Sequence, residues 1–599
     1  MKLYGFLGLY LLCFLPCSAC HGQNLGQSSD GQRTAVLTPN QNYPPTFSSP
    51  SLGYLSTEKS HPLTHDLSQV MHNDLKQGLK LLHEVDKQVL SGFEFFTTHY
   101  LPYLSALVDK QFQAHGRCFL IGSGSSGRIA VDIAAKCAND KVIGIIAGGD
   151  SAFIRAKEGF EDSEEDGRNL ITAHEISAHD LLILVSASGS ASFNVGAAIA
   201  AKEKGATVCY FYNSKEVPQK TERLFTDYGV IPILVDIGPQ AITGSTRLQA
   251  ASLAELCLAC LLTQENPDFL LQALIAANRL IEEQFPAIAS IIQLEQEVFS
   301  HPQANFRKLH DETSQGYVTF LAHKNALREV VMDTVEIPPT FSTNPPRGRN
   351  DWGKKRAEFQ AFLTSDGNNF SWTCPWTTLL GRAVHPDDQQ EVAQFNISEA
   401  GLETDIPFRP VGEGNLVIGV TKNSLRTILC PISHYKGGGA KTALIAFTDH
   451  QNSFKMDPWC DAILIVDGLQ KDKSGIVETI VLKQLLNMIS NGSMIMMNKV
   501  FGNQMVDVKP SNKKLIDRST RLVQDVFTSY QISFPLSSEE LYSKIISISK
   551  KKNEYDLQNT YTPSVVKIAV TMIYKNLNFE DAIEFLNTNQ EQLEKVFTL

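Results

Sequence analysis

The sequence lacks a second long apolar run, because no segment beyond the amino terminus has the roughly 18 uninterrupted apolar residues of a membrane span. Positive charge is also in the minority: 53 lysines and arginines face 64 aspartates and glutamates, for a net charge of −11. That balance argues against nucleic acid as the main partner, although a local basic pocket can still hold an anion. With 599 residues, 43% hydrophobic and 20% charged, the chain fits a globular α/β protein of two or more domains.

A disulfide framework is absent as well. The eleven cysteines are odd in number, and most of those after the amino terminus sit singly in apolar runs, as Cys118, Cys209 and Cys430 do. We therefore expect reduced core residues. Cys257 and Cys260 have metal-like spacing, but they lie in a helical apolar pattern without a second ligand pair. No metal and no cofactor is predicted.

The amino terminus has the pattern of a secretory signal, because Lys2 precedes the apolar run 3–15 and small residues follow. Cys20 after Ser18 and Ala19 also resembles a lipoprotein cleavage site, although Cys17 stands where a leucine is usual. The alternative is a non-exported extension from a misassigned start. Localisation stays open between the two, and a lipid on Cys20 is the one predicted contact with a membrane.

Strand and helix signals alternate from about residue 116, which predicts a parallel sheet with helices on both faces. The expected strands are Cys118–Ile121, Val142–Ala147, Leu181–Ser186, Thr207–Tyr212 and Ile231–Val235, with a helix at Phe193–Lys204. A second cycle looks like a degenerate copy, with strands at Tyr317–Leu321, Leu416–Val420, Thr442–Phe447 and Ala462–Val466.

These signals divide the chain into segments. We expect a leader (1–20), a flexible linker (21–53), an amino-terminal helical segment (54–115), a first α/β domain (116–265), connecting helices (266–315), a degenerate second α/β domain (316–474), a helical segment completing the site (475–530) and a helical cap (531–599).

A glycine- and serine-rich turn, GSGSSGR from Gly122 to Arg128, follows the first predicted strand and opens a helix expected from near Ile129. Its glycines let the backbone approach an anion, while hydroxyls and helix amides donate hydrogen bonds. The turn departs from the Walker pattern, which needs Lys and then Ser or Thr after the last glycine, so nucleotide binding is disfavoured. The predicted phosphate-binding residues here are Gly122, Ser123, Gly124, Ser125 and Ser126.

Two further hydroxyl-rich turns, 186–190 and 243–247, also link a strand to a helix. Ligands bind at strand ends in open α/β sheets. One such turn is easily an ordinary turn, but three on one sheet indicate a site. Its further predicted members are Ser186, Ser188, Ser190, Ser245, Thr246 and Arg247.

At these motifs the chain resembles the sugar isomerase (SIS) domain family, specifically the N-acetylmuramic acid 6-phosphate etherases and the glucokinase regulatory protein. The resemblance begins at 57–62 (TEKSHP), continues through GSGSSGR, 145–162 (IIAGGDSAFIRAKEGFED) and 238–248 (GPQAITGSTRL), and resumes at 492–515. In single-domain etherases the last two segments lie close together, whereas a domain's length separates them here. The resemblance therefore implies two tandem SIS domains, like a covalently fused etherase dimer.

The resemblance also implies acid and base catalysis by two carboxyl groups, which remove the C2 proton of an opened amino sugar, expel D-lactate from C3 and add water. The family glutamate of an EGxED segment matches Glu161, the predicted base. The other family glutamate matches Lys136, but 332–341 (MDTVEIPPTF) in the second domain resembles the missing segment. Glu336 is therefore the predicted acid, reaching the first domain's site from across the interface. Lys514 matches a family lysine near the ligand.

Two functions remain open, and the retention of two candidate glutamates favours the first. The first is an N-acetylmuramic acid 6-phosphate etherase of cell-wall amino sugar catabolism, and the second is a non-catalytic sensor that binds a phosphorylated amino sugar and regulates a partner such as a sugar kinase. An isomerase is disfavoured.

The second domain lacks an intact phosphate turn at 323–328, so one site per chain is expected. The chemistry favours the cytoplasm, against the signal-like leader. Departures from the etherase pattern that a sensor would tolerate are Lys136, Ser190, Gln240, Gln249 and Ala251.

Overall fold

The computed structural model describes residues 52–137, 139–300, 315–349, 351, 356–364, 371–407, 409–449, 458–557 and 562–598. The predicted leader and nearly all of the predicted linker lie outside these residues, as does Cys20. Within the described ranges, no helix combines the length and the apolar character needed to cross a bilayer.

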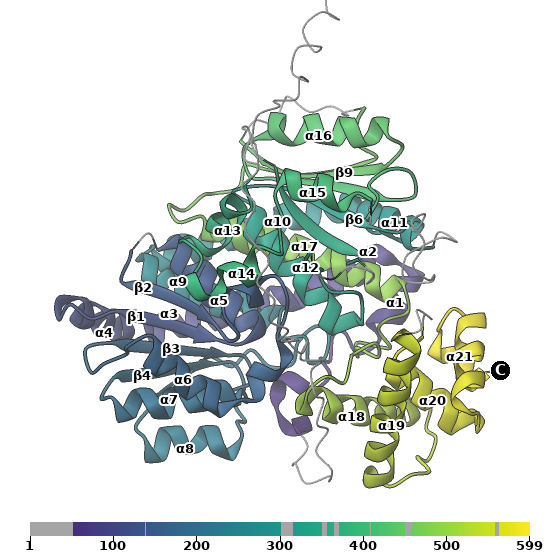
Figure 1. Cartoon of the computed structure of the whole chain (residues 1–599), viewed down its shortest axis with the longest axis horizontal. Coiled ribbons are helices and arrows are strands. Elements are labelled where there is room, and N and C mark those ends of the chain that lie inside the picture. The colour runs from purple at the N-terminus through teal and green to yellow at the C-terminus, as the bar shows by residue number, and fades with distance from the viewer. Residues whose placement is uncertain are drawn as a thin grey trace, which may run out of the picture. The chain divides into compact units, whose positions relative to one another are not determined.

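Two five-stranded parallel sheets organise the chain (Figure 1). The first has the order β2-β1-β3-β4-β5 and contains β1 (Cys118–Gly122), β2 (Val142–Ile146), β3 (Leu181–Ser186), β4 (Thr207–Tyr212) and β5 (Ile231–Leu234). The second has the order β7-β6-β8-β9-β10 and contains β6 (Val318–His323), β7 (Phe359–Thr364), β8 (Leu416–Thr421), β9 (Lys441–Thr448) and β10 (Ala462–Asp467). Both sheets place their first strand between their second and third, so the second repeats the topology of the first. The predicted tandem α/β architecture is confirmed.

Helices cover both sheets. The first sheet carries α5 (Gly124–Lys136), α6 (Glu164–Ala173), α7 (Ser192–Glu203), α8 (Gln219–Asp227) and α9 (Gln249–Thr263), and we call this unit the first domain. The second sheet and the helices between its strands, α12 (Leu327–Phe341), α13 (Thr373–Leu380), α14 (Gln389–Val392), α15 (Glu399–Asp405) and α16 (Leu425–Gly437), form what we call the second domain. Because helices cover both faces, strands such as β1 and β3 are buried along their whole length.

The remaining helices precede, connect and follow the two domains. They are α1 (Leu67–Asn73), α2 (Leu75–Asp86), α3 (Gln88–His99), α4 (Leu101–Gln113), α10 (Pro267–Glu283), α11 (Phe285–Ser300), α17 (Ile476–Met496), α18 (Lys513–Ser529), α19 (Ser538–Leu557), α20 (Val565–Lys575), α21 (Phe579–Thr588) and α22 (Leu593–Thr598).

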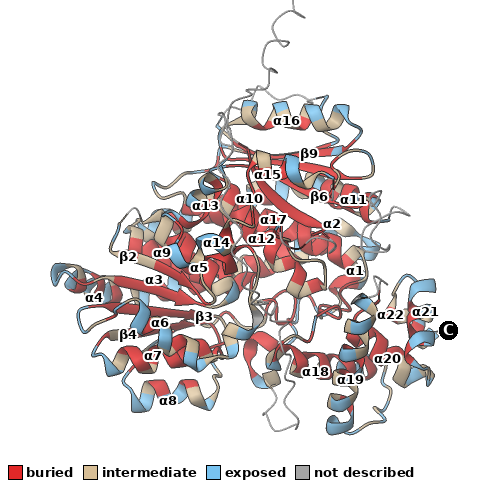
Figure 2. Ribbon diagram, in the orientation of Figure 1, coloured by how far each residue is buried: buried red, intermediate tan, exposed pale blue. Residues whose placement is uncertain are grey.

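Helices α12 and α17 lie between the two sheets (Figure 1). Almost every residue of α17 is buried, which Figure 2 shows as a red helix, because α9, α10, α11 and α12 pack around it. Its buried Lys483 pairs with Glu255 of α9 at 3.2 Å. Buried apolar residues of both domains and of α17 form one continuous cluster, so the two domains share a hydrophobic core.

Three expectations need correction. The strand β7 was missed, because Phe359–Thr364 is poor in β-branched residues and forms a strand through pairing with β6. Helix α5 begins at Gly124 rather than near Ile129, so the serines of the glycine-rich turn belong to its first turn. Cys430 is exposed rather than buried, because it lies on α16 between the inward-facing Ile428 and Ile432. Cys118, Cys209, Cys257 and Cys260 are buried free thiols.

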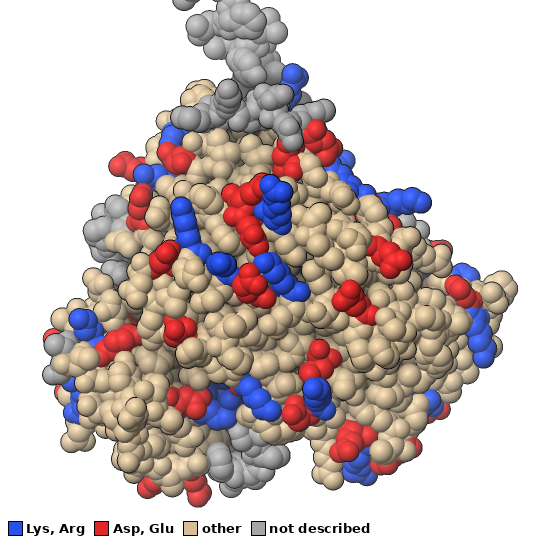
Figure 3. Space-filling view, turned by 180° about the vertical axis from the view of Figure 1, so that it is seen from behind, with Lys and Arg blue, Asp and Glu red and all other residues tan. Residues whose placement is uncertain are grey.

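Charges of both signs are interspersed on the face that Figure 3 shows. Lysine and arginine side chains lie beside aspartates and glutamates there, and they form no continuous basic surface on the coloured part of this face.

Candidate functional site

A cavity of about 160 Å³ opens where β1 and β3 end. Its wall comes from the three hydroxyl-rich turns of the first domain, from α12 of the second domain and from α18. The predicted site residues that line it are Ser123, Gly124, Ser125, Ser126, Glu161, Ser186, Ser188, Ser245, Thr246, Arg247, Glu336 and Lys514. The structure thus brings twelve of the fourteen together, and Gly122 and Ser190 stand outside the lining.

Gly122 shapes the cavity from behind. A Cβ at this position would come within 2.7 Å of the carbonyl carbon of Ser126 and 2.8 Å of the Gly127 nitrogen, so only glycine allows the strand to pass this close to α5. Gly124 has a φ of +53°, which also favours glycine. The first amides of a helix have no intrahelical acceptor, so the start of α5 presents free N–H donors to the cavity.

Two cavity hydroxyls have no partner within the described residues. The Oγ atoms of Ser123 and Ser245 are buried and make no hydrogen bond there. Buried polar groups are normally paired, so such orphans point to a missing ligand or water. Ser190 instead supports the wall, because its Oγ lies 2.8 Å from the Oγ of Ser188.

Lys514 stands near the start of α18, where the Asn512 side chain accepts a hydrogen bond from the Leu515 amide at 2.9 Å and caps the helix. Its Nζ lies 3.8 Å from the Oε1 of Glu161. Glu161 belongs to the short 3₁₀ helix η4 (Glu158–Asp162), and its side chain is 31% exposed.

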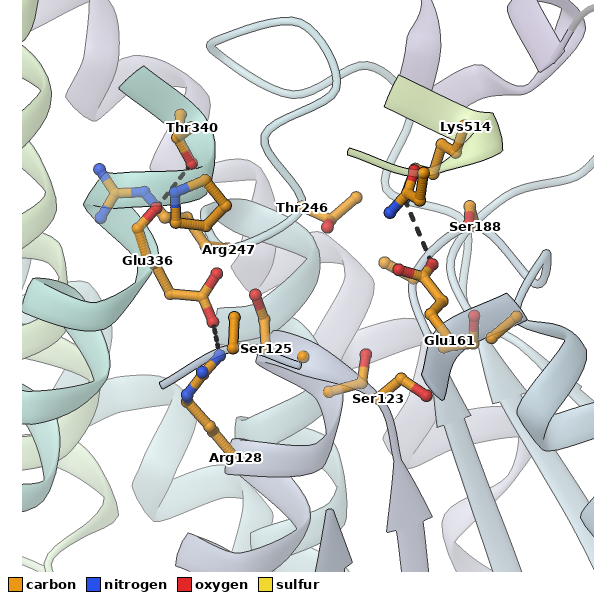
Figure 4. A pocket seen from close by; sticks show the side chains of 18 of the residues that line it. Ser123, Ser125, Arg128, Glu161, Ser188, Thr246, Arg247, Glu336, Thr340 and Lys514 are labelled. Carbon is orange, nitrogen blue, oxygen red and sulfur yellow. Dashed lines mark hydrogen bonds and ion pairs between the residues drawn. The ribbon is translucent and has the colours of Figure 1, made fainter. Parts of the chain in front are cut away.

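Glu336 enters the cavity from α12 of the second domain. Its carboxylate accepts a hydrogen bond from the Nη1 of Arg128, and its side chain is 14% exposed. Figure 4 shows Glu336 and Glu161 on opposite sides of the cavity, with Ser123, Ser125 and Thr246 between them. The structure thus places one carboxylate from each domain against the same row of hydroxyls.

Three cations of the lining had no assigned role in the sequence analysis: Arg128, Lys157 and Arg518. Arg518 follows Lys514 by four residues, so helical spacing alone could have placed both on one face of α18. Lys157 precedes Glu161 by the same interval, but it lies outside a regular helix. Its Nζ is bound to the Gly148 carbonyl at 2.7 Å and to Glu391 of α14 at 2.9 Å.

Arg518 is held by Glu58, which ends the 3₁₀ helix η2 (Ser56–Glu58) of the TEKSHP segment. The Nε of Arg518 lies 2.9 Å from Glu58 Oε2, and its Nη2 donates to the Gly244 carbonyl at 3.1 Å. Burial alone would raise the pKa of Glu58, but Arg518 outweighs it and lowers that pKa to about 2. The TEKSHP segment therefore anchors α18 against the third hydroxyl-rich turn.

Arg247 is engaged between the domains although it borders the cavity. Its guanidinium donates to Asp333 of α12 at 2.7 Å and to Asn491 of α17 at 2.9 Å, and its side chain is buried. Burial raises the pKa of Asp333 above its ordinary value, and Arg247 opposes that shift. Arg247 therefore connects the third hydroxyl-rich turn to α12 and α17.

Lys136, which stands where the family has a glutamate, points away from the cavity lining. Its buried ammonium pairs with Asp132 and lies 3.8 Å from Glu255 and 4.0 Å from Glu329. Burial by itself lowers the pKa of Lys136, but these three carboxylates outweigh it and raise that pKa. Lys136 is therefore part of a buried charge cluster between the domains.

Hydroxyl-rich turns and helix amino termini surround one cavity at the strand ends of a parallel sheet. This arrangement is that of a SIS-type sugar-phosphate protein. The family described as the glucokinase regulatory protein N-terminal SIS domain matches residues 103–202.

Curated relatives extend this match. The N-acetylmuramic acid 6-phosphate etherase of Trichodesmium erythraeum (strain IMS101) is 32% identical over 217 residues, which are 35% of this chain and 67% of the relative. That of Lactococcus lactis subsp. cremoris (strain SK11) is 33% identical over 213 residues, 35% of this chain and 68% of the relative. The chain belongs to the family of the N-acetylmuramic acid 6-phosphate etherases and the glucokinase regulatory protein.

Solved structures overlap more loosely. A tagatose-6-phosphate ketose/aldose isomerase from Escherichia coli has 9% sequence identity and a TM-score of 0.42, covering 71% of this chain and 94% of that chain.

Proposed function

We propose that the protein is an etherase that converts N-acetylmuramic acid 6-phosphate to N-acetylglucosamine 6-phosphate and D-lactate. One observation carries the proposal: Glu161 of the first domain and Glu336 of the second face one cavity lined by hydroxyls (Figure 4). A site that only binds a sugar phosphate has no need of two opposed carboxylates, whereas proton removal followed by proton donation does.

The sugar phosphate is bound by the first domain in this proposal. Ser123, Ser125 and Ser126 and the amides of α5 hold the phosphate, with Ser186, Ser188, Ser245 and Thr246 on the facing turns. Lys514 supplies positive charge, and Arg247 holds the third turn in place. Gly122 and Gly124 give the turn its shape, and Ser190 orients Ser188.

The two carboxyl groups then exchange protons with the open-chain sugar. Glu161, ionised, takes the C2 proton, and the C3–O bond breaks as protonated Glu336 gives its proton to the lactate oxygen. Water adds to C3 of the unsaturated aldehyde while the Glu336 carboxylate takes a proton from that water, and Glu161 returns its proton to C2. Both groups recover their starting states, so one water is consumed for each D-lactate released.

The direct test is to incubate the purified chain with N-acetylmuramic acid 6-phosphate and assay D-lactate. We expect release by the wild type and a loss of about a hundredfold or more in Glu161→Gln and in Glu336→Gln, because each removes an acid or base group. Both variants should still bind N-acetylglucosamine 6-phosphate in calorimetry. A wild type that binds the sugar phosphate tightly but releases no lactate would contradict the etherase.

The same assay tests a second candidate, a non-catalytic sugar-phosphate sensor that controls a partner such as a sugar kinase. It is favoured by the match of residues 103–202 to a regulatory protein domain and by the Lys136 replacement. Activity lost only in Glu161→Gln would leave the etherase standing and would remove the cross-domain role of Glu336.

A further inference from the structure

We propose that Arg128 is the positioning residue of Glu336: it fixes the second domain's carboxyl group over the cavity and stabilises the carboxylate that forms when lactate takes the proton. The inference rests on the proposed function and deepens it. Arg128 lies in the phosphate turn by sequence, yet its side chain serves the opposite wall of the site.

The guanidinium of Arg128 is rigidly held. Its Nε donates to the Phe153 carbonyl at 2.9 Å and its Nη2 donates to the Ala152 carbonyl at 2.9 Å, both in the 3₁₀ helix η3 (Asp150–Phe153). The side chain is 1% exposed. With two edges of the fork held by backbone, the Nη1 group is aimed at one acceptor, the Oε1 of Glu336.

The second domain in turn holds η3. Asp150 accepts from Arg382 at 2.6 and 3.0 Å, and its backbone amide donates to Asp388 at 2.8 Å. Arg128 is therefore connected to the second domain twice, through η3 and through Glu336. A side chain fixed in this way sets the position of Glu336 relative to the phosphate turn, which a flexible loop contact would not do.

Arg128 also matches the charge that the reaction creates. Glu336 becomes negative as lactate leaves, and a guanidinium already in hydrogen-bond contact stabilises that charge without reorganising. Neutralising Arg128 should therefore weaken proton donation by Glu336, while proton removal by Glu161 on the other side of the cavity continues.

Three variants test this step. Arg128→Gln should lower the kcat for lactate release on the order of a hundredfold, because the acid is misplaced and its carboxylate unsupported. Its KM and its affinity for N-acetylglucosamine 6-phosphate should change little. Arg128→Lys, which keeps the charge, should restore part of the rate. Arg168→Gln is the control, because Arg168 also pairs with a glutamate, Glu203 at 3.2 Å, but its side chain is 43% exposed and lies outside the cavity lining, and it should behave as the wild type.

Two readouts separate positioning from a structural role. In D₂O, exchange of the C2 hydrogen should persist in Arg128→Gln while lactate release falls. The double variant Arg128→Gln/Glu336→Gln should be no slower than Glu336→Gln alone, since both changes remove one function.

Opposite outcomes overturn the inference. An additive double variant, or equal loss of C2 exchange and lactate release in a folded Arg128→Gln, would show that Arg128 does not act through Glu336. A large loss of sugar-phosphate affinity in Arg128→Gln would make it a phosphate ligand instead. No lactate from the wild type would overturn the proposed function and the inference together, whereas lactate from the wild type with an additive double variant overturns the inference alone.

Discussion

At the scale of single residues, the orphaned hydroxyls of Ser123 and Ser245 connect stability to binding. A buried hydroxyl without a partner costs folding free energy, and it regains that cost when a ligand accepts its hydrogen bond. Both hydroxyls lie at the cavity wall, on turns that follow different strands. In the ligand-free protein, no hydrogen bond within the described residues offsets the cost of burying these two hydroxyls.

We predict that Ser123→Ala and Ser245→Ala each leave the thermal midpoint of the ligand-free protein unchanged or raised. Each should weaken binding of N-acetylglucosamine 6-phosphate roughly tenfold, the value of one hydrogen bond to a charged group. Calorimetry and thermal denaturation measure the two effects. Ser151→Ala is the matched control, because Ser151 has a buried orphan hydroxyl outside the cavity lining and its loss should not affect affinity. A fall in the midpoint with unchanged affinity would contradict the assignment.

The sequence pattern placed the hydroxyl-rich turns correctly because strand ends of one parallel sheet must meet at one edge. Glu336 was found through a motif that had moved to the second domain. The contacts of Arg247 and Arg518 were not foreseen, because their partners Asp333 and Glu58 lie 86 and 460 residues away in the chain. Local patterns identify residues that face a site, but they do not show which of them another element has already engaged.

At the scale of elements, the packing of α11 against α17 contains a carboxyl group that the proposed reaction does not use. Glu295 of α11 is fully buried and accepts a hydrogen bond from Ser493 of α17. Burial raises the pKa of Glu295 from 4.5 to about 8, and Asp333 adds to that rise. The folded state therefore binds a proton here that the unfolded chain releases near pH 4.5.

The sign of the pH dependence follows from this difference. A raised pKa contributes stability that is complete below pH 4.5 and is lost as the pH rises through about 8, because ionising Glu295 requires burying a charge. We predict that Glu295→Gln, which keeps the acceptor for Ser493, matches the wild type near pH 5 and exceeds its free energy of unfolding at pH 8. Denaturant melts at several pH values measure this. Equal slopes against pH in the two proteins would show that the carboxyl group is not held protonated.

Element types followed from the sequence where an apolar run was continuous, as in Leu181–Ser186 and Thr207–Tyr212. They failed where tertiary contacts decide. Strand β7 (FQAFLT) has Gln360 and Thr364 among apolar residues and forms a strand through its pairing with β6. The start of α5 was placed five residues late, because glycines and serines have low helix propensity, yet they form its first turn above β1.

At the scale of the whole molecule, the two domains have the same topology, but the described turn after β6 lacks the glycines and serines of the turn after β1. In the second domain α12 follows β6 as α5 follows β1, and the first turn of α12 carries Glu329. This buried carboxylate pairs with Lys422, just after β8, at 2.7 Å. Burial by itself raises the pKa of Glu329, but Lys422 and Lys136 outweigh it and lower that pKa. An internal anion thus stands at the helix start where the first domain offers a place for a phosphate.

We predict one sugar phosphate per chain, because Glu329 and Lys422 already satisfy each other at the second helix start and a phosphate there would meet a buried carboxylate. Isothermal titration with N-acetylglucosamine 6-phosphate should give a stoichiometry near one. Ser125→Ala with Ser126→Ala should abolish most of that heat, since both serines belong to the first domain. Thr427→Ala, after β8 of the second domain, should leave it intact. A stoichiometry of two, or binding heat that survives the loss of Ser125 and Ser126, would place a second site in the second domain. Either result would contradict a division of roles in which the first domain binds the sugar phosphate and the second supplies Glu336.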